Sequence, residues 1–96
     1  MIRIVKMTFE EEQVQAFKDL FETIKNKILA REGCKHLRLL QDKDTPTIFF
    51  TYSIWQAQEK LDDYRNSELF ISTWKTVKPW FSEKAEAWSV AEISEA

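Results

Sequence analysis

Few side chains in this sequence could perform chemistry, and most of them are aromatic. The chain has one histidine, His36, and two tyrosines, Tyr52 and Tyr64. His36 has the unperturbed pKa closest to neutrality, so it could act as a base; the alternative is a surface or hydrogen-bonded strand histidine. Either tyrosine could bind a substrate oxygen through its hydroxyl, and the alternative is core packing with a satisfied hydroxyl.

Four tryptophans add a large flat surface to this small chain. Trp55 and Trp74 could stack on a flat ligand, and the alternative is ordinary core filling. Trp80 and Trp88 lie near the C-terminal end, where we expect contacts with a second subunit.

Two arginines and a cysteine complete the candidates. Arg38 and Arg65 could pair with an anionic group of a substrate, against the alternative of exposed salt bridges. Cys34 is interpreted as a small buried hydrophobic residue, against the alternative of a redox thiol.

The scarcity of glycine, cysteine and histidine excludes several chemistries. The chain has one residue of each type. One glycine cannot form a dinucleotide fingerprint, a P-loop or a nucleophile elbow. One cysteine and one histidine cannot form a cysteine zinc cluster or a multi-histidine metal site. We therefore expect an apolar, aromatic site with few titrating groups and no metal.

Size and charge indicate one small globular domain over residues 1–96. The 96 residues carry a net charge of −2, which argues against a nucleic-acid-binding surface. No apolar run is long enough to span a bilayer, so no membrane partner is expected. A lone cysteine fits a reducing compartment, and the cytoplasm is the expected location.

Hydrophobic patterning predicts seven elements. Residues 2–8 alternate as a strand, and Thr8 with Glu11 has the spacing of a capping box for a helix that runs to about Arg31. Gly33, the only glycine, is expected to cap that helix with a positive φ. The further elements are strands at 35–41 and 47–55, helices at 56–65 and 67–78, and a strand at 84–93.

The resulting order, β-α-β-β-α-α-β, predicts an α+β fold of the ferredoxin-like type. Such a fold has a four-stranded antiparallel sheet with the helices on one face. The strand at 47–55 is apolar on both faces, so the other face of the sheet would expose too much apolar surface in a monomer. We therefore expect a homodimer that packs sheet against sheet.

The order and spacing of several residues resemble the antibiotic biosynthesis monooxygenase family. These are Gly33-Cys34, the spacing to Trp55, and the run from Tyr64-Arg-Asn-Ser67 to Phe70. The resemblance covers nearly the whole chain. It implies a dimeric α/β barrel with one pocket per subunit, between the sheet and the helices. Members include cofactor-free oxygenases of phenolic polycycles or quinols, haem-degrading enzymes and proteins of unknown role.

The family's known functional residues are mostly replaced here. Haem-degrading members carry an Asn, a Trp and a His iron ligand where this chain has Val5, Tyr64 and Trp74, so haem degradation is disfavoured. Cofactor-free polyketide oxidases have an Asn four residues before the strand Trp, a position that Thr51 occupies here. Many quinol-type relatives have a His at the position of Tyr64.

These observations lead to two hypotheses. The first is a homodimeric, cofactor-independent monooxygenase that acts on a small aromatic or quinol-like substrate. Its catalytic residues would be His36 and Tyr64, with the substrate bound by a second group of four: Thr51, Tyr52, Trp55 and Trp74. The alternative is a non-catalytic, dimeric binding or sensing protein that keeps the pocket.

Overall fold

Alternating and amphipathic segments fold as an α+β domain in the computed structural model, which describes residues 1–96. The strands are β1 (Ile2–Phe9), β2 (Cys34–Gln41), β3 (Ile48–Trp55) and β4 (Phe81–Val90). The helices are α1 (Val14–Leu29), α2 (Gln58–Arg65) and α3 (Glu68–Val77), with short 3-10 turns at Glu11–Gln13 and Lys78–Trp80. The predicted element order is confirmed, although the last strand begins and ends three residues earlier than expected.

The four strands form one antiparallel sheet in the order β2-β3-β1-β4. The first strand therefore lies inside the sheet, between β3 and the last strand. Ile4 of β1 faces Tyr52 of β3 on one side and Trp88 of β4 on the other. This is the predicted ferredoxin-like topology.

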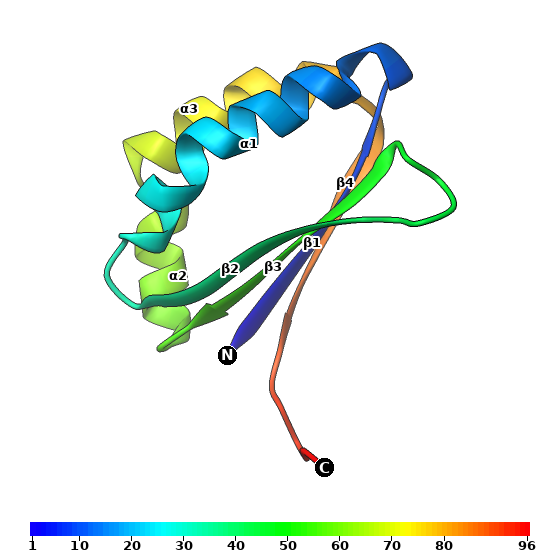
Figure 1. The fold of residues 1–96 in the computed structure, drawn as a ribbon. Coiled ribbons are helices and arrows are strands. Elements are labelled where there is room, and N and C mark those ends of the chain that lie inside the picture. The colour runs from blue at the N-terminus through cyan, green and yellow to red at the C-terminus, as the bar shows by residue number, and fades with distance from the viewer.

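All three helices cover one face of this sheet, and the other face is bare (Figure 1). Residues 91–96 continue past β4 and extend away from the body (Figure 1). None of the helices combines the length and the apolar character that a membrane span requires.

The core lies between the sheet and the helices. Its centre consists of Met7 and Phe9 from β1, Phe17 from α1, Phe49 from β3 and Val77 from α3. Phe9 stacks on Phe17 with ring centroids 4.3 Å apart, which ties the first strand to the first helix. Trp80 is partly buried and packs against this cluster within the subunit, and its contact with a second subunit stays a prediction.

Two expectations about the ends of α1 need correction. Thr8 is not a helix cap, because it belongs to β1 and pairs with Ile48 and Glu83. The α-helix starts six residues later, at Val14, after the 3-10 turn, and its N-cap Gln13 makes no side-chain capping bond. Strand pairing thus continues to Phe9 and prevents Thr8 from capping.

Gly33 has the predicted positive φ, +86°, but it is not the cap of α1. The helix ends at Leu29 with Ala30 as C-cap, and Gly33 lies in the turn just before β2. A Cβ added at Gly33 would lie 2.5 Å from Cβ and Cγ of Lys60 in α2. The glycine therefore allows α2 to pack closely against this turn, and the ion pair of Lys60 Nζ with Glu32 Oε1 (2.8 Å) spans the same junction.

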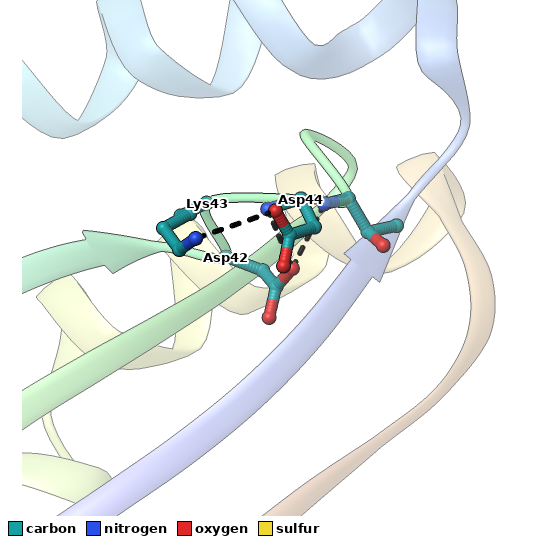
Figure 2. A network of polar contacts seen from close by, with 4 residues as sticks. Asp42, Lys43 and Asp44 are labelled. Atoms are coloured by element: carbon teal, nitrogen blue, oxygen red, sulfur yellow. Dashed lines mark hydrogen bonds and ion pairs between the residues drawn. The ribbon is translucent and has the colours of Figure 1, made fainter.

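The connection between β2 and β3 is closed by local polar contacts. The carboxylate of Asp42 accepts backbone N–H groups from Asp44 (3.1 Å) and Thr45 (2.8 Å), as Figure 2 shows. Lys43 Nζ lies 3.7 Å from Asp44 Oδ1, and both side chains are exposed. This Asx turn fixes the hairpin at the end of the sheet opposite to α2 (Figure 1).

Candidate functional site

A cavity of about 430 Å³ lies between the sheet and the helix layer. It is lined by 21 residues from all four strands and all three helices, and 15 of them are hydrophobic. This volume falls within the range of small-molecule sites, roughly 300–1,000 Å³. The cavity is therefore large enough for a flat molecule of two or three fused rings.

An uninterrupted series of aromatic contacts forms much of its wall. Trp55 stacks on Tyr64 with centroids 5.2 Å apart and an interplanar angle of 22°. Tyr64 meets Phe70 edge to face at 5.3 Å, and Phe70 stacks on Trp74 at 5.7 Å and 9°. Strand β3 and helices α2 and α3 thus bring together four rings that are separated along the chain.

A buried hydrogen bond fixes the indole of Trp55. Its Nε1–H donates to Ser53 Oγ at 2.9 Å, and Ser53 Oγ–H donates to the carbonyl oxygen of Arg3 at 3.4 Å. Trp55 is 1% exposed and Ser53 is 7% exposed. Because its only donor is already used, Trp55 offers a ligand an apolar surface and no hydrogen bond.

Tyr64 provides a hydroxyl that stays protonated at neutral pH. Burial, together with the nearby Cys34, raises the pKa of Tyr64 to about 12, although the Arg31 charge acts in the opposite direction. A phenol with such a pKa is a hydrogen-bond donor at pH 7 and not a base. The Tyr64 hydroxyl makes no hydrogen bond within the protein. Because every fully buried polar side-chain atom has a hydrogen-bond partner, this hydroxyl must be accessible to solvent or to a ligand.

Four of the six predicted site residues line this cavity. They are Thr51, Trp55, Tyr64 and Trp74. Thr51 and Trp55 are on the helix-facing side of β3, Tyr64 is in α2, and Trp74 is in α3.

The other two predicted site residues, His36 and Tyr52, do not line the cavity. They contact each other edge to face at 6.1 Å on the bare face of the sheet, beside a shallow hollow that Arg38 and Leu40 also border. The expectation that His36 faces the pocket is therefore wrong. Side chains alternate along β2, and His36 is in phase with Arg38, whereas Leu37 faces the cavity.

Sequence reasoning did not select Arg3 or Ser53, which both line the cavity. The signal for Arg3 is visible in the alternation of the first strand. Arg3 is in phase with Val5 and Met7, so it is a charged residue on a face that is otherwise apolar.

Cys34 lies half-buried at the start of β2, next to the site. Burial raises the pKa of its thiol. The thiol also contacts the carbonyl oxygen of His36 at 3.8 Å, and this weak hydrogen bond offsets only part of the rise in pKa. A thiol with a raised pKa is a poor nucleophile at neutral pH. No group of three or more histidine, cysteine, aspartate or glutamate side chains comes together in the chain.

The chain is similar to known proteins both in sequence and in fold. The family model described as "Antibiotic biosynthesis monooxygenase" matches residues 1–76. The chain belongs to the antibiotic biosynthesis monooxygenase family. No curated protein matches it at a significant level.

Many solved structures share this fold. A conserved protein from Methanosarcina mazei Go1 is 25% identical, with a TM-score of 0.84 over 90% of this chain and 86% of that chain. Rv0793 from Mycobacterium tuberculosis is 17% identical, with a TM-score of 0.89 over 99% and 96%. A structure described as an antibiotic biosynthesis monooxygenase is 15% identical, with a TM-score of 0.89 over 98% and 100%.

Proposed function

We propose that this protein is a cofactor-independent monooxygenase that oxidises a flat, quinol-like or anthrone-like molecule in the cavity. The observation that carries the proposal is the aromatic wall formed by Trp55, Tyr64, Phe70 and Trp74, in a chain of the monooxygenase family. Such a wall binds fused rings by stacking and excludes water from them.

In the proposed reaction the substrate supplies all the electrons. A methylene between two aromatic rings becomes a carbonyl: the methylene compound and one molecule of dioxygen give the ketone and one molecule of water. The substrate first loses a proton to hydroxide from the solvent, because the cavity wall provides no base, and forms a carbanion or phenolate. This anion reduces oxygen and takes up a proton from water to form a hydroperoxide, which loses water to give the ketone. Tyr64 would donate a hydrogen bond to the anionic oxygen of the substrate, because its pKa keeps it protonated.

We further propose that two subunits pack through the bare face of the sheet. This face carries a row of apolar side chains that are only partly covered within one subunit: Ile2, Ile4, Leu40, Ile48, Phe50, Ile54, Trp88 and Val90. Trp88 and Leu40 are 44% and 45% exposed. An apolar patch spread over four strands is the kind of surface that a second copy covers. The lone, half-buried Cys34 supports a reducing location such as the cytoplasm.

The test is oxygen uptake with a panel of anthrones and quinols. The wild-type protein is expected to accelerate uptake above the rate without protein, and Tyr64→Phe to reduce it by about tenfold or more, as for loss of one transition-state hydrogen-bond donor. Tyr52→Phe is the matched control, since Tyr52 lies on the other face of the sheet, and it is expected to retain the activity. No acceleration over the whole panel would contradict the proposal.

A second function is favoured by the position of His36. Without His36, the cavity has no side chain with an ordinary pKa near neutrality, so a catalytic base is missing from its wall. A dimeric binding or sensing protein would need the cavity but no base. Stoichiometric binding of an anthrone or quinol without oxygen uptake would favour this alternative.

A further inference from the structure

Two guanidinium groups border the aromatic cavity, one from each layer of the fold. Arg3 comes from β1, and Arg65 is the last residue of α2. Arg3 is only half-exposed, and the pleat of β1 places its side chain on the same side as Val5 and Met7, toward the helices. The largely apolar wall thus contains two positive charges.

No carboxylate neutralises either of these charges directly. The three ion pairs of the structure all use lysines: Lys25, Lys43 and Lys60. Arg3 makes one side-chain hydrogen bond, from Nη1 to Ser89 Oγ at 3.0 Å. A guanidinium has five N–H donors, so most of those on Arg3 remain available.

The two arginines also repel each other. Burial and the charge of Arg65 lower the pKa of Arg3, and the attraction of Asp62 is the weakest of the three effects. Asp62 Oδ1 is in addition engaged by Gln58 Nε2 at 2.9 Å. A bound anion would remove this repulsion and would receive the free N–H groups of both arginines.

The remaining side chains of the cavity provide no other charge. Glu86 borders the cavity from β4. In the sheet it lies opposite Lys6 of β1, and the pleat places both side chains on the bare face. Tyr64 is neutral at pH 7. The two arginines are therefore the charges that the cavity offers to a ligand, and they favour a ligand that carries a negative charge.

From this arrangement we propose that Arg3 and Arg65 form an anion-recognition site at the aromatic cavity, and that the ligand is a flat aromatic carboxylate. A planar carboxylate fits because guanidinium groups bind it through two parallel hydrogen bonds. The proposal rests on the proposed function for the aromatic half of the ligand. The new element is the carboxylate of the ligand, which Arg3 and Arg65 would bind.

The test compares binding of 2-naphthoate and 2-naphthamide, which differ in charge but hardly in shape, by calorimetry at low salt. Neither needs to be oxidised, so binding is measured without turnover. Wild-type protein is expected to prefer naphthoate by about tenfold or more, and high salt is expected to reduce the preference. Arg65→Gln, at an exposed position that tolerates substitution, and Arg3→Gln should each reduce the preference, and the double variant should abolish it.

Lys43→Gln is the charge-matched control, because Lys43 lies in the exposed β2–β3 connection (Figure 2), and it should keep the full preference. Equal binding of the two probes to wild-type protein, or a preference that survives in the double variant, would overturn the anion site while leaving the aromatic cavity intact. Failure of both probes to bind would overturn the anion site together with the aromatic cavity. Normal circular dichroism of each variant separates lost recognition from lost folding.

Discussion

The indole ring of Trp55 stacks on the phenol ring of Tyr64, with centroids 5.2 Å apart and planes 22° apart. This contact joins the end of β3 to α2, so it positions the phenol hydroxyl of the cavity, which can donate a hydrogen bond at any physiological pH. The same burial that creates the contact also raises the pKa of Tyr64.

We predict that Tyr64 makes the folded protein lose stability in alkali. The pKa of Tyr64 is about 12 in the fold and 10 in an unfolded chain. Folding therefore favours the neutral phenol. The contribution of Tyr64 to the free energy of unfolding is fully present below pH 10 and is lost as the pH rises from 10 to 12. By pH 11 the loss should be about 1.4 kcal/mol.

Urea unfolding of wild type and Tyr64→Phe at pH 9, 10 and 11 would measure this loss. The stability of Tyr64→Phe should fall less with pH than that of wild type, and Tyr52→Phe is the control that should follow wild type. Parallel curves for wild type and Tyr64→Phe would contradict the prediction.

We predict that Ser53→Ala destabilises the fold by about 1–3 kcal/mol, because it leaves the buried Trp55 Nε1–H without an acceptor. Chemical denaturation measures the change. Ser89→Ala removes a hydroxyl that accepts a bond from exposed Arg3 atoms, and it should change stability by no more than about 0.5 kcal/mol. If the two serine variants were equally stable, the Ser53–Trp55 bond would have no special importance.

We predict that Gly33→Ala costs more than its single methyl group suggests. A positive φ disfavours alanine by about 1–2 kcal/mol, and the new Cβ would collide with Lys60. Denaturation in wild-type and Lys60→Gly backgrounds separates the two causes, since only the collision is relieved by Lys60→Gly. An unchanged unfolding midpoint for Gly33→Ala would show that the turn can adopt another conformation.

We predict that Phe50→Arg converts the proposed dimer into monomers, because Phe50 lies on the bare sheet face and a buried, unpaired charge is costly. Light scattering at micromolar concentration measures the mass. Ile71→Arg, at a position of α3 that is 53% exposed, is the control and should leave the mass unchanged. Wild-type protein that is monomeric in this measurement would rule out the sheet-to-sheet dimer.

Local patterns were sufficient to predict the elements but not the site. Alternation in β1 and β2 correctly separates Val5 and Leu37 from Ile4 and Arg38. It also places His36 on the face away from the cavity, so a side chain with suitable chemistry is in the wrong phase to act there. Arg3 is in phase with the cavity side of β1, and its charge on this otherwise apolar strand face is the signal that points to it.

Other features depend on contacts between distant segments, which periodicity does not report. Thr8 matches a capping box in sequence, but pairing with Ile48 keeps it in β1. The pKa of Tyr64 is raised mainly by burial and secondly by Cys34, and both effects arise only when α2 packs against distant parts of the chain. The volume of the cavity likewise depends on how far the helices stand from the sheet.

The position of β1 between β3 and β4 also has a consequence for synthesis and folding. Ile2 pairs with Val90, so the sheet joins nearly the first residue of the chain to one of the last. During translation β1 must wait for β4 to leave the ribosome, and until then one of its edges is unpaired and open to aggregation. Because its pairing is so non-local, the domain should fold more slowly than a helical bundle of equal size.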